Sequence, residues 1–587
     1  MNLATHAPAP RPQALDCDTL CAAFQQTASE RPDDVALRTK DGAHEVTWAQ
    51  YADRVRRLAA GFSALGIGRG DTFALMLANR PEFHIADAAA MHLGAVAFSV
   101  YNTSAPEQIE YLLGDAANRV LVTERAFADR IAAVRDRVPS LEHVVVVDGA
   151  QDGALSLEDV EARGAEDFDF DAAWRAVAPD DLLTLIYTSG TTGPPKGVQL
   201  RHSNLIAEMR GLSGFGIEPG GRVVSYFPMA HVAERNASHY IPMGWGHTVT
   251  CCPDPRAVAA YLPEVRPTSF FAVPRIWEKL KSAIEAGVEA EPDEQRRIAT
   301  KRALEVALRR VRAEQAGEEV SPELAAEHAK ADELVLSAIR ARIGFDDLRW
   351  VVVGAAPTPV EVLEFWHALG VPISEVWGLS ETSAVATINP PERIKIGTVG
   401  PAIPGVEVRL APDGEVLVRG GIVMAGYRNA PDRTAEVLDE DGYLRIVDRK
   451  KELIINAAGK NMSPANIEAR LKTSSPLIGQ ACAIGDARPY NVALIVLDPD
   501  GAAQFAADRG IEDRSLAALA AHPEVHGEVE AGVARANEAL SRVEQIKRFT
   551  LLDSDWEAGG EELTPTLKLK RKPIAAKYAA AIDALYA

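Results

Sequence analysis

Residues 187–197, with the sequence YTSGTTGPPKG, constrain the fold of this chain more than any other stretch. They follow the apolar run at 182–186, which predicts a buried strand opening into a loop of hydroxyls, glycines and one lysine. Glycines let backbone N–H groups approach anionic oxygens, hydroxyls supply donors or a metal ligand, and the lysine adds a positive charge. The loop is therefore suited to wrap a polyphosphate, although many Ser/Thr/Gly-rich stretches are ordinary turns. It is not the familiar nucleotide loop, because no Gly-Lys-Ser/Thr opens a helix after it.

Composition limits the class of protein. A chain of 587 residues predicts several folding units, and 47% hydrophobic with 25% charged residues is typical of a soluble globular protein. The net charge of −21 argues against nonspecific nucleic-acid binding, which needs a basic surplus.

The sequence also bears on the cellular compartment. Residues 1–17 are rich in Ala, Pro and polar side chains without the apolar core of a signal peptide, which predicts a flexible tail. The five cysteines fit neither a disulfide framework nor a zinc site, and no run of about 18 apolar residues predicts a membrane span. We expect a cytoplasmic protein, with peripheral contact to a membrane left open. The sequence does not indicate an oligomeric state.

Helical and strand patterns alternate along the first 177 residues. Helical spacing covers 48–65 and 82–93, and short apolar runs at 73–77, 96–100, 120–123 and 144–148 predict strands. Such alternation predicts parallel sheets with helices on their faces. Two further strands, 350–353 and 373–377, end in the turns Gly354-Ala355-Ala356 and Gly378-Leu379-Ser380-Glu381. Ligands bind beyond the carboxyl ends of parallel strands, so both turns are candidates for a nucleotide site.

Three other segments contribute to the interpretation. An aromatic run at 223–235 contains His231, which is either structural or the border of a pocket. Residues 283–343 are rich in Ala, Glu and Arg and predict a helical insertion at the surface. Its basic clusters favour a solvated helix face over contact with anionic lipid or nucleotide phosphates. Residues 397–447 change to short strands with tight turns, which predicts a β subdomain.

These motifs, followed by GKNMSP at 459–464 and LTPTLKLKR at 563–571, occur in the order found in the adenylate-forming superfamily. From about residue 18 to its end the chain resembles that superfamily, and its insertion and C-terminal motif resemble the long-chain fatty acid–CoA ligase branch. The resemblance implies an α/β fold: a large N-terminal AMP-binding domain at 18–447, with mainly parallel sheets and the β subdomain, and a small mobile α+β domain at 448–587. Asp448 would be the hinge.

The resemblance also implies the site. The nucleotide and coenzyme A would contact Ser189, Gly190, Thr191, Thr192, Gly193, Lys196, Gly354, Ala355, Ala356, Trp377, Gly378, Ser380, Arg449, Gly459, Lys460 and Asn461. Trp377 would stack on adenine in place of the more usual tyrosine. Thr188 and Glu381 would hold Mg²⁺, although a lone glutamate is otherwise a solvated side chain. Lys568 would be the mobile catalytic lysine rather than part of a solvated tail, and His231 with Gly354 would border the acyl pocket.

One family motif is missing. Members normally carry a Thr-Gly-Asp between segments like 434–438 and 441–449, and its aspartate receives both ribose hydroxyls. This chain runs directly from one segment to the other, and Thr-Gly-Asp occurs nowhere in it. Asp439 or Asp441 could substitute, but full replacement is the less favoured expectation.

The function that the resemblance implies has two steps. A long-chain fatty acid reacts with ATP to give acyl-AMP, and coenzyme A then takes the acyl group as a thioester. Two alternatives remain open at this point. One is acyl or aryl adenylation with transfer to a carrier protein, and the other is a catalytically impaired acyl- or nucleotide-binding homologue that lacks the ribose aspartate.

Overall fold

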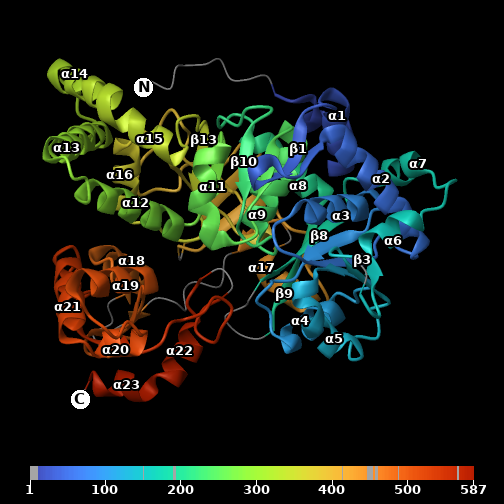
Figure 1. Ribbon diagram of the computed structural model, residues 1–587. Helices are drawn as coiled ribbons and strands as arrows, with labels where there is room; N and C mark the ends of the chain where they lie inside the picture. The colour runs from blue at the N-terminus through green and yellow to red at the C-terminus, as the bar shows by residue number, and fades with distance from the viewer. Residues whose placement is uncertain are drawn as a thin grey trace. The chain divides into compact units, whose positions relative to one another are not determined.

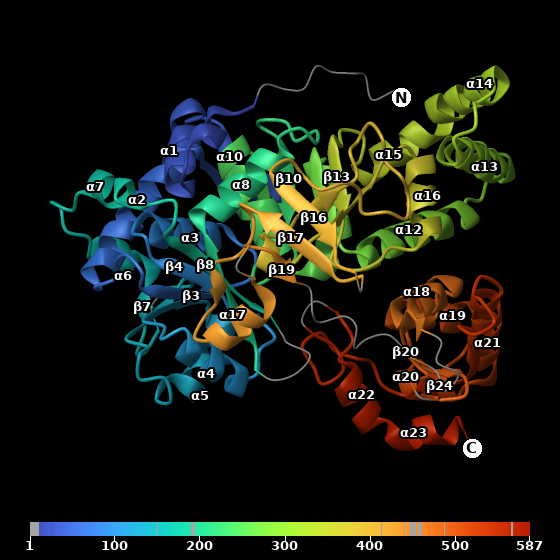
Figure 2. The same cartoon turned by 180° about the vertical axis from the view of Figure 1, so that it is seen from behind.

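The computed structural model describes residues 11–149, 151–188, 194–412, 414–439, 441–445, 454–455, 461–486, 488–564 and 567–586. The chain forms two compact units, drawn in Figure 1 and, from behind, in Figure 2. The first comprises Met1–Val273, Val288–Ala355 and Glu364–Ile446, and the second comprises Pro274–Gly287, Ala356–Leu363 and Val447–Ala587. The hinge predicted at Asp448 lies outside the described residues, so the boundary there stays a prediction.

An eight-stranded sheet forms the centre of the first unit. Its strands lie in the order β18 (Gly426–Tyr427), β9 (Lys196–Arg201), β8 (Leu182–Thr188), β4 (Val96–Ser99), β3 (Thr72–Met76), β5 (Val120–Thr123), β6 (His143–Val146) and β7 (Leu155–Ser156). Neighbours from β8 to β7 are parallel, whereas β9 and β18 form an antiparallel edge. The mainly parallel sheet that the sequence predicts is confirmed.

Helices cover both faces of this sheet, which is why β3, β4 and β5 are buried along their whole length. Both views show α3 (Pro81–His92) on one side of the strands and α4 (Pro106–Asp115) with α5 (Ala128–Arg135) on the other (Figure 1, Figure 2). On the second side, Ala74 and Met76 of β3 share a core with Ile109 and Ile131 of the two helices. Strands buried on both faces appear in the sequence as continuous apolar runs, which is why the sequence predicts them.

Three smaller sheets complete the described strands of the first unit. They have the orders β10 (Arg222–Ser225), β11 (Thr248–Cys251), β1 (Val35–Thr39), β2 (Glu45–Thr47); β12 (Ser269–Ala272), β13 (Trp350–Val353), β14 (Ser374–Trp377), β15 (Thr387–Ile388); and β16 (Val406–Leu410), β17 (Val416–Gly420), β19 (Leu444–Arg445). The last is the small antiparallel sheet of the region expected to be a β subdomain. β18 lies in that region of the sequence but pairs with β9, so the segment 397–447 contributes to two sheets.

The remaining helices outside the insertion are short, apart from α2, and connect these strands. They are η1 (Gln13–Asp16), α1 (Leu20–Glu30), η2 (Lys40–Gly42), α2 (Trp48–Ala64), η3 (Arg125–Phe127), α6 (Leu157–Ala162), α7 (Phe170–Arg175), α8 (His202–Leu212), α9 (Val232–Arg235), η4 (Asn236–Tyr240), α10 (Ile241–Trp245), η5 (Pro255–Ala257), α11 (Val258–Val265), α16 (Val360–Ala368), η7 (Ser380–Thr382) and α17 (Pro431–Val437). η4 is a single π-helical turn, a feature that often marks a functional region.

The segment 283–343 is helical. It contains the end of α12 (Pro274–Glu289), then α13 (Glu294–Ala316), α14 (Pro322–Ala331), η6 (Asp332–Leu336) and α15 (Ser337–Ile343). Asp293 caps α13 by accepting from the Gln295 and Arg296 N–H groups, and Gly317 ends it in the left-handed conformation with φ 74°. Within the described ranges, no helix is both long and apolar enough to cross a bilayer.

The second unit is a smaller α+β fold. Its three-stranded sheet consists of β22 (Ile478–Ile484), β23 (Asn491–Leu497) and β24 (Ile546–Leu552), and β20 (Ile454–Ile455) pairs with β21 (Asn461–Met462). Its helices after residue 447 are α18 (Pro464–Ser474), α19 (Pro499–Arg509), α20 (Leu516–Ala521), α21 (Pro523–Glu538), α22 (Arg571–Lys577) and α23 (Ala579–Ala584), and most of α12 and the start of α16 also belong to this unit. β23 is buried throughout and shares a core with α18 and α21. The predicted α+β character of this part is confirmed.

Candidate nucleotide site

The predicted phosphate loop connects two antiparallel strands. β8 ends at Thr188 and β9 begins at Lys196, and these two residues face each other in the ladder. The Thr188 hydroxyl lies 3.5 Å from the Lys196 carbonyl oxygen, to which it donates. The loop residues Ser189, Gly190, Thr191, Thr192 and Gly193 lie outside the described part of the chain. The geometry thus fixes both ends of the loop and brings Thr188 beside Lys196.

The strand before the loop runs two residues further than the sequence predicts, because Tyr187 belongs to the packed sheet. Its hydroxyl donates to Asp115 Oδ2 at 2.7 Å, and burial, the main cause, raises the pKa of this phenol. The ring lies against Gly197, where a Cβ would come within 3.1 Å of it. Glycine at 197 therefore lets the returning strand pass close to Tyr187.

The turn after β14 is tightly built. A Cβ at Gly378 would lie 2.0 Å from the Ala384 carbonyl oxygen, so only glycine fits. Ser383 and Ala384 adopt positive φ values of 59° and 105°, and the Ser383 hydroxyl donates to the Ile422 carbonyl at 2.8 Å. The Glu381 carbonyl accepts from the Met424 N–H at 2.9 Å. These bonds hold the backbone on which Glu381 is presented.

Glu381 and Lys196 meet at one tyrosine. The Tyr427 hydroxyl donates to Glu381 Oε1 at 2.8 Å, and the Lys196 ammonium lies over the Tyr427 ring at 4.9 Å from its centroid. Three of the predicted residues, Thr188, Lys196 and Glu381, are thereby connected through side-chain and strand contacts. No sequence pattern indicates a role for Tyr427, because it lies in a two-residue strand without periodicity.

The other predicted turn, at Gly354, follows β13 at the same edge of the sheet as the turn that follows β14. β13 and β14 are parallel, with Val353 opposite Glu375, so Gly354 and Val376 are neighbours. A Cβ at Gly354 would lie 2.7 Å from Val376 Cγ2, and Ala355 adopts a positive φ of 69°. Trp377 and Ser380 are partly exposed and Ala356 is exposed, so their side chains are accessible for contacts with a ligand.

Glu208 supports the segment that follows the Glu381 turn, a role that no sequence pattern indicates. Its Oε1 accepts from the Val385 N–H at 2.7 Å, directly after the turn, and its Oε2 accepts from Asn236 Nδ2 at 2.6 Å. Burial raises the pKa of Glu208 well above the usual value, more than the two hydrogen bonds lower it. The carboxyl therefore links α8, the π-helical turn and the Glu381 turn.

His231 has a local structural role. It precedes α9, its Nδ1 accepts from the Ala233 N–H at 3.1 Å, and its ring packs edge-on against Phe227 with centroids 5.3 Å apart. It is also partly exposed. The sequence leaves a structural role and a pocket role open for His231. The structure shows the structural role, capping of α9, whereas contact with an acyl chain stays a prediction.

The shortened connection after α17 closes as a tight turn. Leu438 forms a bridge with Leu444, and the Tyr443 N–H donates to Asp439 Oδ1 at 2.8 Å. The Asp439 N–H in turn donates to the Tyr443 carbonyl at 3.1 Å. The Asp439 carboxylate thus already helps to close the turn, which restricts how far it can move toward a ribose.

The second unit carries Lys568 on a narrow hairpin. Leu563 bridges Leu569, the Lys568 N–H donates to Thr564 Oγ1 at 3.0 Å, and the Thr564 N–H donates back to the Lys568 carbonyl at 2.8 Å. The side chain of Lys568 is exposed. Asn461 pairs with Ile455 in β21, whereas Arg449, Gly459 and Lys460 lie outside the described residues.

The donor set suits a hard cation. Glu381 supplies a carboxylate and Thr188 a hydroxyl, and Mg²⁺ prefers oxygen ligands. Among the residues that the structure describes, no group of three His, Cys, Asp or Glu side chains could hold a metal. One carboxylate still fits Mg²⁺, because that ion is commonly bound by one or two carboxylates together with substrate phosphates and water.

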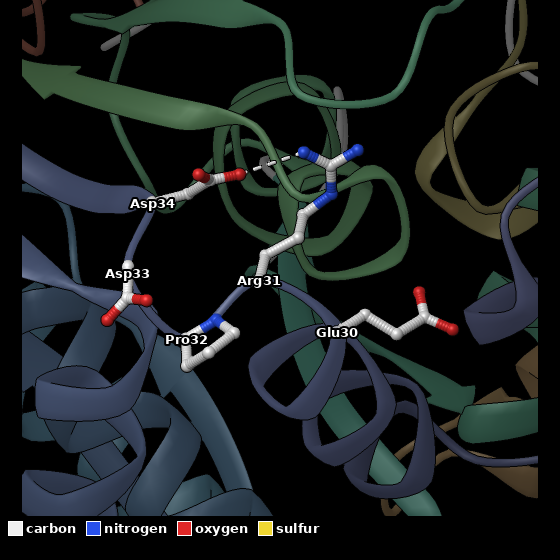
Figure 3. Close-up of a pocket in the computed structure, with 5 residues that line it drawn as sticks. All are labelled: Glu30, Arg31, Pro32, Asp33 and Asp34. Carbon is white, nitrogen blue, oxygen red and sulfur yellow. Dashed lines mark hydrogen bonds and ion pairs between the residues drawn. The ribbon is translucent and has the colours of Figure 1, made fainter.

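Surface pockets among the described residues include two that differ in their relation to the candidate site. One, of about 400 Å³, is lined by Glu30, Arg31, Pro32, Asp33 and Asp34, with the Arg31 guanidinium donating to Asp34 Oδ2 at 2.9 Å (Figure 3). The other, of about 380 Å³, lies between β9, β18 and α17 and includes Tyr427 in its lining. Only the second adjoins a residue of the candidate site.

An α/β fold with a hydroxyl- and glycine-rich sequence between β8 and β9, a glutamate in the turn after β14 and a smaller α+β unit is the combination expected of adenylate-forming enzymes. The chain belongs to the AMP-binding enzyme family: residues 24–428 match the family itself, and residues 451–587 match the AMP-binding enzyme C-terminal domain.

Named relatives place the chain within the family. It is 53% identical over 451 residues to the putative fatty-acid–CoA ligase fadD11 of Mycobacterium tuberculosis, covering 74% of this chain and 79% of the relative. It is 36% identical over 600 residues to the long-chain-fatty-acid–CoA ligase FadD15 of the same organism, covering 97% of both. The fold is similar to that of the adenylation domain of a carboxylate reductase from Mycobacterium chelonae, with a TM-score of 0.73 at 19% identity over 98% of this chain and 93% of that one.

Proposed function

We propose that this chain activates a long-chain fatty acid with ATP and transfers the acyl group to coenzyme A. The observation that carries the proposal is the likeness to a long-chain-fatty-acid–CoA ligase over 97% of both chains. The fold match to a carboxylate reductase domain carries no information on the substrate, because its identity is only 19%.

In the first step a fatty-acid carboxylate oxygen attacks the α-phosphorus of ATP and pyrophosphate leaves, giving acyl-AMP. The loop between Thr188 and Lys196 surrounds the phosphates, and the Lys196 ammonium neutralises charge that develops on their oxygens. Trp377 supplies a face for adenine, and the turn at Gly354 lies along its edge. When bound, Mg²⁺ would be held by Glu381 and Thr188 and would offset phosphate charge.

In the second step the thiol of coenzyme A attacks the acyl carbonyl and AMP leaves. Lys568 serves the first step, by contacting the phosphoryl oxygens, and the Gly459-Lys460-Asn461 side serves the second. The two steps therefore use different faces of the second unit. The domain arrangement proposed is 18–447 and 448–587, with Asp448 as the hinge.

Two assays test the function with the full chain. Exchange of pyrophosphate into ATP that depends on palmitate reports the first step, and palmitoyl-CoA formation with free coenzyme A reports the second. We expect both. Exchange without thioester formation would favour transfer to a carrier protein, and fatty-acid or ATP binding without exchange would favour an impaired homologue.

Replacing the catalytic lysine separates the two steps. Lys568→Ala should lower the exchange rate about 10²- to 10³-fold, the typical loss for one charged or hydrogen-bonding group that stabilises a transition state. Thioester formation from supplied acyl-AMP should change much less. Lys572→Ala removes a neighbouring exposed lysine and should leave both rates near wild type. Equal losses in the two steps for Lys568→Ala would contradict its assignment to the first.

A further inference from the structure

Tyr427 lies between two charged groups of the candidate site. Its hydroxyl donates to Glu381 Oε1 at 2.8 Å, and its ring lies under the Lys196 ammonium at 4.9 Å. The tyrosine is only 8% exposed, so packing holds the ring while its hydroxyl meets Glu381 and its face meets Lys196. Glu381 follows β14 and Lys196 begins β9, so a single side chain joins groups from two different sheets.

The backbone around Tyr427 is fastened on several sides. It faces Val198 in the β9–β18 ladder, and its N–H donates to Thr434 Oγ1 at 2.9 Å. The next residue, Arg428, donates from its N–H to the Gly197 carbonyl at 2.8 Å and from its guanidinium to the Ala116 carbonyl at 2.6 Å. The hydroxyl of Tyr427 is therefore presented from a rigid strand rather than from a free loop.

A fixed donor on one carboxylate oxygen has two consequences. It restricts the rotamers of Glu381, a long side chain that would otherwise sample several. It also occupies Oε1 and leaves Oε2 for a cation, an arrangement in which an outer partner orients a metal ligand. The ring face meanwhile attracts the Lys196 ammonium through its quadrupole.

We propose that Tyr427 is a positioning residue that orients the Glu381 carboxylate for a divalent cation and holds the Lys196 ammonium for the phosphates. The inference rests on the proposed ATP site and goes beyond it by assigning a residue that acts through the metal ligand. It touches neither substrate nor cation. Its contribution is therefore separable into a part that needs the cation and a part that does not.

The test measures ATP binding to the full chain by calorimetry, once with Mg²⁺ and once with EDTA. Tyr427→Phe keeps the ring and removes the hydroxyl. It should weaken binding about 10-fold with Mg²⁺, within the usual range for losing an outer partner of a metal ligand, and less than about 2-fold with EDTA. Tyr427→Leu also removes the ring, so it should weaken binding about 2- to 5-fold in EDTA as well.

Tyr586 provides a control away from every residue of the candidate site. Its hydroxyl donates to the Ile484 and Tyr490 carbonyl oxygens at 2.9 and 3.0 Å, and the Arg488 guanidinium lies over its ring at 4.7 Å, so it too combines a donating hydroxyl with a cation on its ring face. Tyr586→Phe should leave ATP binding unchanged in both conditions.

The outcomes are distinct. If Tyr427→Phe weakens ATP binding equally with Mg²⁺ and with EDTA, or does not weaken it at all, the inference is wrong. The proposed function stands in that case as long as the wild-type chain binds ATP. Failure of the wild-type chain to bind ATP in either condition would overturn both. A thermal unfolding midpoint near that of wild type establishes that Tyr427→Phe is folded.

Discussion

Replacing Glu208 by glutamine should reduce the pH dependence of stability without harming adenylation. Glu208 is fully buried, at 0% exposure, and its two oxygens accept from Val385 N–H and from Asn236 Nδ2. Asn236 Oδ1 has no hydrogen-bond partner among the described atoms. If the Asn236 amide turns over, its Oδ1 faces Glu208 and can accept a hydrogen bond from the protonated carboxyl. The side-chain amide of a glutamine at 208 can donate in the same way, so glutamine imitates the protonated acid.

The sign and size follow from the raised pKa of Glu208. The folded chain keeps the proton at a pH where the unfolded chain has lost it. The stabilisation is thus fully present below the unfolded pKa, near 4.3, and falls as pH rises toward the folded pKa. One proton corresponds to about 1.4 kcal/mol per pH unit in that window. Between pH 5.5 and 6.5 wild type should therefore lose more stability than Glu208→Gln, by at most about 1.4 kcal/mol.

Urea unfolding gives the free energy of unfolding of each protein at both pH values. The change between the two pH values is then compared between wild type and Glu208→Gln. Other buried acids also titrate, among them Glu234 and Glu375, each with a pKa raised to about 7 by burial, but they are present in both proteins and cancel. Glu208→Ala is the contrasting variant. It leaves the Val385 N–H unpaired and should cost about 1–3 kcal/mol at both pH values, and it should slow pyrophosphate exchange because Val385 follows the turn that carries Glu381. An identical pH dependence for wild type and Glu208→Gln would refute the reasoning.

Two further changes test the ribose end of the site and the buried charges. Inserting a Tyr/Trp-to-Thr-Gly-Asp segment between Leu438 and Tyr443 should tighten ATP binding roughly 10²- to 10⁴-fold, since two hydrogen bonds to a charged group are worth about 3–6 kcal/mol; unchanged affinity in calorimetry would show that the missing aspartate does not matter here. Asp87→Ala should lower the free energy of unfolding by about 3–5 kcal/mol, because it leaves the guanidinium of Arg235, 0% exposed, without its ion-pair partner. Asp53→Ala breaks an exposed pair and should cost less than about 1 kcal/mol, so comparable losses in urea unfolding would contradict the burial argument.

The parts of the fold that the sequence predicted are those with a local signal. The strand at 120–123 was placed without error because burial on both faces makes it a continuous apolar run. The composition of residues 189–193 predicts a phosphate loop, and the structure shows the two antiparallel strands that this segment connects. Tyr427 and Glu208 could not be assigned in this way, because their roles depend on partners 46 and 177 residues away in the chain. Nothing in a two-residue strand or a single helical glutamate specifies such partners.

The antiparallel edge of the large sheet explains why the site divides into separable parts. Because β9 returns antiparallel to β8, Lys196 comes back beside Thr188, and β18 adds the tyrosine that reaches Glu381. The residues proposed for phosphate and metal contacts thus depend on the same edge strands. The turn between Leu438 and Leu444 belongs instead to the small sheet, through the pairing of β19 with β17. Loss of the Tyr427 hydroxyl alone should therefore act on ATP binding through the cation, whereas a restored ribose segment should act equally with Mg²⁺ and with EDTA.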